Sequence, residues 1–502
     1  MLRRLIKLLV VLSVSLAVIV GLGLGAAALT THYVFQEPAL VTWSRYLKPE
    51  IRWQRHLHPE AGWAFDLIEG FLVAGDPRDR FAIAETARPL PGPEAWTSAL
   101  VGPRVTGLGA EAPDPKEIVL IASVEDLKEA IRTARPGQVI QIQPGSYRVS
   151  ERSIQVETAG APDQPIVVRA AALGTARFEF DILEGFHVQA PHWIFENLVI
   201  EGICADDSAC EHAFHVVGEA TNVVIRNNWI TNFNAAIKVN AKQGRVPDEG
   251  LILHNALIND RPRMTENPVA VVDIVAASRW RVQRNLIADF AKGLGDRVSY
   301  GAFFKGAGDG NVFEQNLVFC ERRLTGGIRI GFSFGGEGTK PSVCRDGACA
   351  VEHQRGLARY NIIANCPHAA GVQLYKSADT EIHNNLLANT KGIDLLSVES
   401  DAVIANNVID GRIMAHDGAR ASESHNVVST LKAMLLDKVT SDIYADAEGG
   451  DFRLRDLDSF LDPGTPLETA GPDFCGQPYD PAAPAIGPIQ YSLQMSCTPV
   501  IQ

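Results

Sequence analysis

The sequence predicts an all-β protein: a right-handed parallel β-helix with an N-terminal capping helix, preceded by one transmembrane or signal helix. Two observations predict the solenoid. A short phrase containing Asn recurs, mostly at spacings of 19 to 31 residues with one of 45, and each copy is rich in Val and Ile with two-residue alternation. A unit of this size cannot bury its own apolar face, so the units must stack.

The repeated phrase reads apolar, variable, apolar, one or two polar residues, Asn, then two apolar residues. Its copies centre on Asn197, Asn228, Asn255, Asn285, Asn316, Asn361, Asn385, Asn407 and Asn426. Helical repeats would need amphipathic stretches of ten or more residues, which the phrase lacks. We expect the asparagines at the turn between two strands, where their side chains hydrogen-bond along the coil and tolerate left-handed backbone. They are therefore predicted to be structural.

The flanking segments set the expected domain organisation. A short helix over 123–131 should cap the open core and end near Arg135–Gly137, with Gln138–Ile142 as the first strand. The expected domains are a signal-anchor or signal peptide over 1–29, a membrane-proximal stalk over 30–115, the β-helix over 116–430, and a C-terminal wrapping tail over 431–502.

The first residues combine a positive head, Met1–Arg4 with Lys7, and an uncharged apolar run, Leu8–Leu29. Such a run is long enough to cross a bilayer as a helix, with its cationic end in the cytoplasm. The alternative is a cleaved signal peptide, because Gly25–Ala28 offers small residues near a cut site. Either alternative places the bulk of the chain outside the cytoplasm, anchored in the periplasm or at the cell surface, or secreted if residues 1–28 are removed.

Composition excludes two broad classes of protein. The charged fraction of 21% and hydrophobic fraction of 46% are those of a folded chain, not a disordered one. The formal charge of −13 argues against a nucleic-acid binder, which needs a basic surface. An acidic average still allows a local basic cleft, so an anionic polysaccharide remains a candidate partner.

The eight cysteines agree with export. Cys204 and Cys210 bracket one short loop, and Cys344 and Cys349 bracket another. Cys320 and Cys366 lie in the repeats, whereas Cys475 and Cys497 lie in the tail. Four disulfides are expected, with their pairing open. Zinc binding by these cysteines is the rival, but no CxxC pair supports it.

The stretch Leu127–Gly145 and the Asn repeats resemble the right-handed parallel β-helix superfamily, the pectin-lyase-like proteins, which includes polysaccharide lyases, glycoside hydrolases and epimerases. The stretch from Phe303–Gly306 to Gly327–Gly331 is similar to the alginate lyase and chondroitinase B family. That resemblance implies that Lys305 is a base and that Arg329 neutralises the substrate carboxylate. It also implies a Ca²⁺ site, but the acidic ligands expected before the lysine are replaced by Val298–Gly301, so a metal requirement stays open.

The chemistry explains why such a pair would be needed. Cleavage of a uronate chain by elimination removes the proton beside the carboxylate, and a cation must first neutralise that carboxylate. A lysine acts as the base only if burial or nearby positive charge lowers its pKa. Because Phe304 and Ile330 are expected to point inward, the alternation predicts that Lys305 and Arg329 point outward into one cleft.

Extending this alternation gives an outward row that suits a sugar-binding groove. Its members are Lys238, Asn240, Asp273, Lys305, Arg329, Gln373, Tyr375 and Asp394. The alternative is a solvated sheet face in which Lys305 simply forms a salt bridge with Asp273.

A second polar cluster follows the glycine-rich stretch Gly335–Gly338 and contains Glu352, His353 and Arg355. We expect it to close over the groove, with His353 and Arg355 contacting substrate and His353 available as an acid or base. The alternative is that Glu352 and Arg355 only pin a loop. A phosphate-binding loop is excluded because no Gly-Lys-Ser/Thr follows.

The sequence therefore leaves three hypotheses about function open. The first is a uronate-polysaccharide lyase using Lys305 and Arg329. The second is a non-catalytic β-helix that binds or scaffolds envelope glycan. The third is a glycoside hydrolase using carboxylates such as Asp273 and Glu352.

Overall fold

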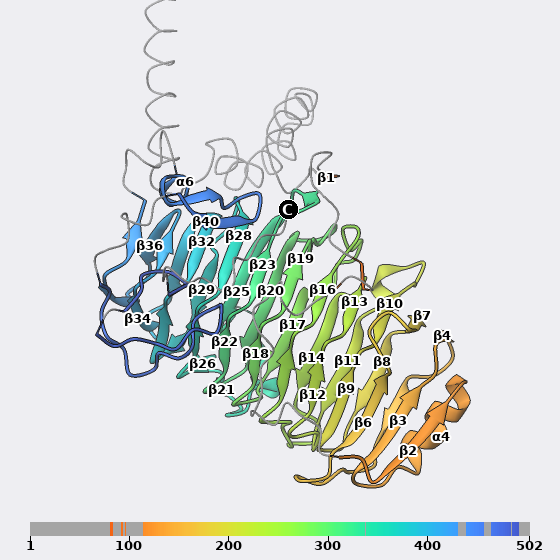
Figure 1. Ribbon diagram of the computed structural model, residues 1–502. Coiled ribbons are helices and arrows are strands. Elements are labelled where there is room, and N and C mark those ends of the chain that lie inside the picture. Colours follow the sequence, from red (N-terminus) through yellow and green to blue (C-terminus); the bar gives the residue numbers. More distant parts are fainter. Residues whose placement is uncertain are drawn as a thin grey trace, which may run out of the picture. The chain divides into compact units, whose positions relative to one another are not determined.

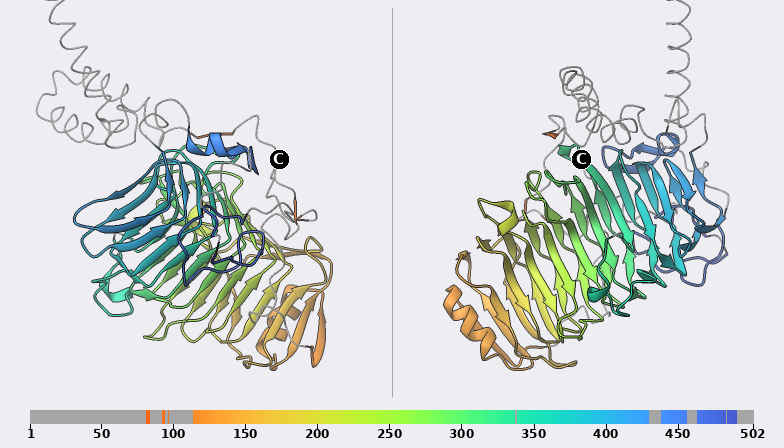
Figure 2. Two further views of the ribbon diagram at one scale, coloured as in Figure 1. Left: turned by 60° about the vertical axis from the view of Figure 1, so that its left-hand side comes forward. Right: turned by 180° about the vertical axis from the view of Figure 1, so that it is seen from behind.

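The computed structural model describes residues 81–83, 92–93, 96, 114–336, 338–429, 438–455, 463–482 and 484–490. Three long sheets of 12, 11 and 10 strands dominate the described chain, and every pairing within them is parallel. One coil visits each sheet once before the next begins, and the coils stack side by side (Figures 1 and 2). The predicted parallel β-helix is confirmed.

The first sheet contains β2 (Glu117–Ile121), β3 (Gln138–Ile142), β6 (Ile166–Ala170), β9 (Trp193–Glu196), β12 (Val224–Arg226), β15 (Leu251–Leu253), β18 (Arg281–Gln283), β22 (Val312–Glu314), β27 (Leu357–Arg359), β31 (Thr380–His383), β34 (Asp401–Ala405) and β37 (Arg420–Ser424). The second contains β4 (Gly145–Val149), β7 (Ala176–Phe180), β10 (Val199–Gly202), β13 (Trp229–Thr231), β16 (Ala256–Ile258), β19 (Leu286–Ala288), β23 (Leu317–Phe319), β28 (Ile362–Cys366), β32 (Leu386–Thr390), β35 (Val408–Ile409) and β38 (Val427–Val428). The third contains β5 (Ile154–Val156), β8 (Glu184–Val188), β11 (His212–Val217), β14 (Ala235–Asn240), β17 (Val269–Val275), β20 (Val298–Lys305), β25 (Ile328–Phe334), β29 (Val372–Tyr375), β33 (Gly392–Leu396) and β36 (Arg412–Ala415).

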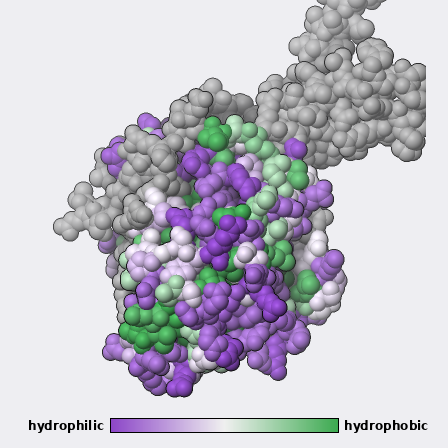
Figure 3. All heavy atoms as spheres, turned by 90° about the vertical axis from the view of Figure 1, so that its right-hand side faces the viewer, coloured by the Kyte–Doolittle hydropathy of each residue, from purple (hydrophilic) through white to green (hydrophobic). Residues whose placement is uncertain are grey.

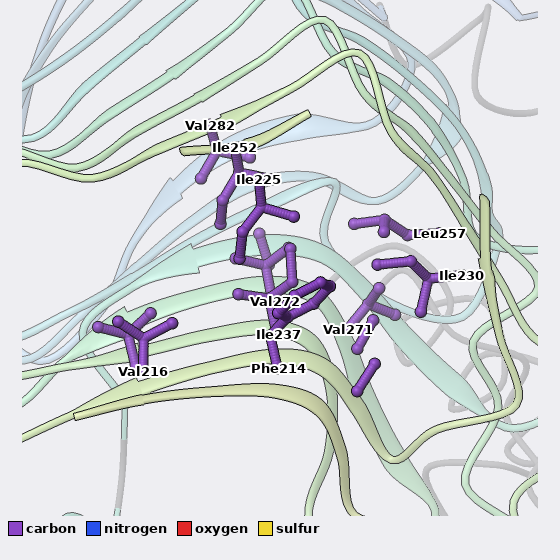
Figure 4. Packing of buried hydrophobic residues seen from close by; sticks show 14 of the residues in the cluster. Phe214, Val216, Ile225, Ile230, Ile237, Ile252, Leu257, Val271, Val272 and Val282 are labelled. Carbon is purple, nitrogen blue, oxygen red and sulfur yellow. The ribbon is translucent and has the colours of Figure 1, made fainter. Parts of the chain in front are cut away.

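The core lies inside the coil, where the three sheets turn their alternate side chains toward one another. Figure 4 shows this packing: Ile225, Ile252 and Val282 come from the first sheet, and Phe214, Ile237 and Val272 from the third. The labelled residues of each sheet stack from one coil to the next. Each coil therefore buries its apolar side chains only with the help of its neighbours.

The asparagine ladder runs along the turn between the first and second sheets. The Asn285 amide donates to Asn316 Oδ1 at 3.0 Å, and Asn285 Oδ1 accepts from the backbone N–H of Asn255 at 2.9 Å. Both side chains are fully buried. The same bond continues through Asn361, Asn385, Asn407 and Asn426. The asparagines are structural, as predicted.

Two details of the ladder differ from the prediction. The left-handed backbone belongs to the residue before the ladder position, such as His254, Arg284 and Gln315, and not to the ladder asparagine. Asn197 occupies that left-handed position in its own coil, with φ at 62°, so the first rung falls on Leu198. The turn thus tolerates several residue types at the left-handed position, whereas every ladder position from Asn228 to Asn426 holds an asparagine.

The third sheet bends at a column of mostly small residues, which we call the corner column: Gly185, Ala213, Ala236, Val271, Gly301, Gly331 and Gly371. A Cβ on Gly301 would lie 2.4 Å from the Gly331 carbonyl oxygen, so the backbones touch there. Ser299 and Ala302, on either side of Gly301, are both fully buried. The alternation of inward and outward side chains therefore shifts by one residue at this column. Two outward side chains on the same strand, three residues apart in sequence, lie on either side of the column and face each other.

The two ends of the coil are covered differently. Helix α4 (Val124–Arg132) begins at Ser123, which caps it, and buries Val124, Leu127 and Ile131 over the first coils. One strand, β2, precedes this helix, so Gln138–Ile142 is the second strand of its sheet and not the first. Figure 3 looks at the α4 end, where the surface is mostly hydrophilic with scattered hydrophobic patches.

The described part of the tail packs on the outside of the second sheet. Helix α6 (Val439–Ile443) and the hairpin of β39 (Tyr444–Asp446) and β40 (Asp451–Leu454) place Tyr444 and Phe452 in a second apolar cluster with Leu386 and Val408. Residues 463–482 and 484–490 run along the outside of the ladder turn. There the Arg284 guanidinium donates to the Phe474 carbonyl at 2.9 Å.

Part of the expected stalk also contacts the β-helix. Strand β1 (Ala82–Ile83) pairs antiparallel with β24 (Leu324–Thr325), and Trp96 packs edge-on against Trp229. Among the described residues, no helix is long and apolar enough to cross a membrane. The predicted N-terminal helix over 1–29 lies outside them.

Three disulfides close within the described chain: Cys204–Cys210, Cys320–Cys366 and Cys344–Cys349. The two short loops are therefore closed as expected. Cys475 is also disulfide-bonded, and Cys497 lies outside the described residues.

Candidate functional site

The third sheet carries a row of polar side chains on its outer face, on the far side of the corner column from Ser299. Parallel register places His187 of β8 beside His215 of β11, then Lys238 of β14 and Asp273 of β17. Phe303 of β20 takes the next place. Figure 1 shows β8, β11, β14, β17 and β20 as five neighbouring strands. Successive strands are about 4.8 Å apart, so the register puts these side chains in a continuous line.

Asp273 lies between two lysines. Its carboxylate bonds to Lys238 Nζ on one side, and Lys305 Nζ stands 3.8 Å from its other oxygen. Lys305 Nζ also lies 4.0 Å from the centroid of the Phe303 ring, which stacks on Tyr300. Asp273 is 4% exposed. The charges of Asp273, Lys238 and Lys305 are therefore held close to the sheet and largely shielded from bulk water.

Burial and charge act in opposite directions on these groups. Burial lowers the pKa of Lys305; Asp273 raises it in part, whereas the ammonium of Lys238 lowers it further. Burial works against the Asp273 carboxylate, but Lys238 and Lys305 together outweigh this, and the pKa of Asp273 lies below its ordinary value. Lys305 therefore has an ammonium that gives up its proton more readily than an exposed lysine does.

A groove of about 430 Å³ opens over Lys305. The third sheet contributes Lys238, Asn240, Val275 and Lys305 to its walls, and a loop over 338–345 covers the other side with Lys340 and Arg345. Among the described residues that line it, four carry positive charge and none is Asp or Glu. The groove therefore favours an anionic ligand, although the chain as a whole is acidic.

The loop over the groove is firmly held. Cys344 and Cys349 are bridged, and the Arg345 amide donates to the Gly306 carbonyl at 2.9 Å. The Arg345 guanidinium binds Asp248 with both nitrogens, at 2.8 and 3.0 Å. These bonds fix the cationic wall before any ligand arrives, which reduces the entropy lost on binding.

The prediction that Arg329 shares a cleft with Lys305 is wrong. Register pairs Arg329 with Ser299, whereas Lys305 lies six residues further along the same strand, β20. Arg329 is 2% exposed and its guanidinium donates to the carbonyls of Cys320 and Gly326. The corner column explains the error. Strict alternation from the inward-facing Phe332 makes Arg329 face outward, but the bend at Gly331 shifts the alternation by one residue and turns Arg329 inward.

The predicted role of His353 also fails on geometry. His353 is fully buried, stacks on Phe334 with ring centroids 4.5 Å apart, and bonds Asn311 through Nε2 at 3.0 Å. Burial lowers its pKa to about 3, so the ring is neutral at ordinary pH. Strand β26 (His353–Gln354) pairs with β21 (Gly308–Asp309) and β30 (Ser377–Ala378), which places the ring in the core and not over the groove.

Arg355 and Glu352 hold the loop in place, which is the alternative to a role in substrate binding. Arg355 is exposed and forms an ion pair with Asp309. Glu352 is buried and accepts from the Gly306 amide at 2.8 Å, and its burial raises the pKa of its carboxyl. Glu352 thus anchors the backbone directly after Lys305.

The remaining predicted residues continue the outer face beyond the groove. Gln373 and Asp394 follow Ser333 in the row that holds Asp273. Tyr375 follows Leu374, the register partner of Phe334, and so lies beside Gly335, two strands from Lys305. Binding roles for Gln373 and Tyr375 stay predictions. Asn240 lines the groove and accepts a bond from His215 Nε2 at 2.7 Å.

Sequence reasoning missed several residues of this site. Lys340 and Arg345 reach the groove through a disulfide-closed loop whose position no periodicity encodes. Glu184, His187 and His215 form a compact cluster beside Lys238. A usable signal existed for the cluster, because Glu184-Gly-Phe-His187 and His212-Ala-Phe-His215 repeat one pattern in consecutive coils.

Two clusters of three potential metal ligands occur in the described part of the chain: Glu184 with His187 and His215, and Cys344 with Asp346 and Cys349. The two cysteines are bonded to each other and cannot bind an ion. Neither cluster is the set of several carboxylates and carbonyls that Ca²⁺ prefers. The Ca²⁺ site implied by the resemblance stays untested.

This architecture defines the chain as a parallel β-helix protein. Among solved structures it is similar to pectate lyase Pel9A, at 14% identity and a TM-score of 0.51, over 75% of this chain and 97% of that one. Weaker similarity links it to an alginate lyase from Paenibacillus sp. str. FPU-7 (16% identity, TM-score 0.38, 62% and 99% covered). It also links it to an α-1,3-glucanase from Streptomyces thermodiastaticus strain HF3-3 (13% identity, TM-score 0.39, 64% and 70% covered). No family model and no curated protein matches the sequence. At such identities the likeness to the pectate lyase establishes the shared fold.

Proposed function

We propose that this chain binds an anionic polysaccharide along the outer face of the third sheet and cleaves it by β-elimination, with Lys305 as the base. The observation that carries the proposal is Lys305 itself. Its ammonium is mostly shielded from solvent, has a lowered pKa, and opens into a groove whose described lining is cationic. A pectate lyase with the same fold supports the class of reaction.

The elimination assigns each charge a task. Lys238, Lys340 and Arg345 supply the positive charge that neutralises a uronate carboxylate, a task that Arg329 cannot perform from its buried position. Neutral Lys305 then takes the proton from the carbon beside the carboxylate. The electron pair left on carbon forms the new double bond, and the bond to the glycosidic oxygen breaks. That oxygen leaves with its electron pair and takes a proton from water.

The row beyond the groove suits a chain-like substrate. From His187 to Asp394 the outer face crosses eight strands, roughly 34 Å at about 4.8 Å per strand. Such a surface offers sites for several sugar rings, and Tyr375 supplies an aromatic face against which a ring can pack. We further propose that the protein works outside the cytoplasm, because three disulfides persist best in an oxidising compartment.

The test uses the full chain and a panel of uronate-containing and neutral polysaccharides. A lyase product absorbs in the near ultraviolet through its new double bond. We expect this signal from wild type and its loss in Lys305→Arg, which keeps the positive charge but cannot serve as a base. Lys128→Ala, at a partly exposed position of α4 outside the groove, is the matched control and should keep the wild-type rate. An unchanged rate in Lys305→Arg would refute Lys305 as the base.

Binding without cleavage is the second candidate function. It is favoured by the ion pairs that hold both Lys238 and Lys305 on Asp273. Its signature is tight binding to an anionic glycan with no product, weakened in both Lys305→Ala and Lys340→Ala. New reducing ends without ultraviolet absorbance would instead indicate hydrolysis by carboxylates.

A further inference from the structure

The corner column brings Glu184, His187 and His215 together. Strict alternation would place Glu184 and His187 on opposite faces of β8, but the bend at Gly185 turns both outward. Register then adds His215 from the next coil, directly beside His187. Glu184 Oε2 lies 2.8 Å from His187 Nδ1, and Glu184 Oε1 lies 2.8 Å from His215 Nδ1.

The hydrogen bonds around His215 aim its Nδ1 at the Glu184 carboxylate. Asn240 Nδ2 donates to the Ala241 carbonyl at 2.9 Å, which fixes the amide so that Oδ1 faces His215. His215 Nε2 must therefore carry a hydrogen to donate to Asn240. In a neutral ring this leaves a lone pair on Nδ1, facing a carboxylate oxygen at 2.8 Å. A metal ion between Nδ1 and Glu184 Oε1 would bind both of these lone pairs.

Further features of the surroundings favour the metal ion. A ligating histidine commonly donates its other ring nitrogen to an oxygen acceptor, which is the role Asn240 fills for His215. The three ligand atoms lie within 4.8 Å of one another, and all three side chains are only partly exposed. His212, the register partner of Glu184, adds a fourth imidazole-or-carboxylate group beside the cluster, with its ring 5.0 Å from that of His215. Its Nδ1 is buried and has no hydrogen-bond partner in the described chain.

We propose that Glu184, His187 and His215 form a binding site for a divalent transition metal of the zinc class. Two imidazoles and one carboxylate are a ligand set that such ions take, and they leave an outward position for water or a ligand oxygen. The site lies one strand from Lys238, so a bound ion adds fixed positive charge at the head of the polar row. This inference does not rest on lyase chemistry.

One neighbour opposes the metal and sharpens the test. Lys242 Nζ lies 3.4 Å from His187 Nε2 and is tied to Gln189. An ammonium only donates, so in the metal-free protein Nε2 holds the lone pair and Nδ1 the proton. Metal binding through Nδ1 requires the proton to move to Nε2 and Lys242 to turn away. Removal of the Lys242 charge should therefore tighten metal binding.

The experiment titrates the full chain, freed of metals by chelator, with Zn²⁺ in a calorimeter and with Co²⁺ by visible absorption. We expect one ion per chain, a cobalt spectrum with nitrogen ligands, and affinity lowered at least tenfold in Glu184→Gln and in His215→Ala. His416→Ala is the matched control, because His416 is a partly exposed histidine directly after β36 and lies 4.0 Å from Asp394 of the same sheet. The affinity of this variant should equal that of wild type. Lys242→Met should bind more tightly than wild type.

Several results would overturn the proposal. Absence of stoichiometric binding to wild type would show that Glu184, His187 and His215 form a hydrogen-bonded cluster and not a metal site. Equal binding by wild type and Glu184→Gln would place the ion elsewhere. Weaker binding by Lys242→Met would contradict the ligand assignment of His187. Because the decisive titration uses the wild-type chain, a variant that fails to fold does not leave the question open.

Discussion

Asp273→Asn tests the charge arrangement beneath the groove. The substitution keeps the size of the side chain but removes the negative charge that Lys238 contacts directly and that Lys305 faces at 3.8 Å. Both ammonium groups then stay on the sheet with less than a quarter of each side chain exposed and no carboxylate beside them. Breaking a buried ion pair by removing one partner costs about 3–5 kcal/mol. Because both lysines keep some contact with water, we expect a loss near the lower end, about 3 kcal/mol.

Urea unfolding of the full chain followed by circular dichroism measures this loss. The pH dependence has a definite sign. The pKa of Asp273 is lowered in the folded protein, so its contribution is complete above the ordinary aspartate pKa of about 3.9 and is lost as the pH falls through the folded value. The difference between wild type and variant should therefore be constant near neutral pH and shrink under acid conditions.

The same substitution has an opposite effect on the base. Asp273 raises the pKa of Lys305, so its removal makes neutral Lys305 available at lower pH. The acid limb of the pH–rate profile for elimination should move to lower pH in Asp273→Asn. Asp181→Asn is the control, since its partner Arg148 is largely exposed and such pairs contribute about 0–1 kcal/mol. A variant as stable as wild type, with an unmoved rate profile, would refute the proposed coupling of the three charges.

Three further predictions concern the frame. Asn285→Ala removes the acceptor of the buried Asn255 backbone N–H and a donor to the Ile252 carbonyl. It should lower the free energy of unfolding by about 2–4 kcal/mol in urea, against a smaller loss for Asn197→Ala. Arg329→Met should alter stability but not the Michaelis constant for an anionic glycan; a raised constant in a stable variant would restore Arg329 to the site. Gly301→Ala should cost about 1–3 kcal/mol because its Cβ would meet a carbonyl at 2.4 Å, whereas Gly92→Ala, with open space, should melt like wild type.

The candidate site was only partly visible in the sequence. Lys238, Asn240, Asp273 and Lys305 were predicted to share one face, and the structure does place them together, because each lies on the far side of the corner column, where simple alternation holds. Arg329 lies on the near side. Alternation counted through Gly331 assigns Arg329 to the outer face, which is wrong, because a two-residue pattern in the sequence does not reveal a bend of the backbone.

The sequence by itself determined the coil. Its spaced asparagines and alternating apolar residues act between neighbouring strands, and such short-range periodic contacts are written directly in the order of residues. Only the tertiary structure decided which charges meet. The phase change at the corner column turned Arg329 into the core and Glu184 toward His187, and a disulfide-closed loop carried Lys340 and Arg345 to Lys305. These contacts depend on where the backbone bends and on where a long loop packs back against the sheet. No local sequence pattern encodes either position.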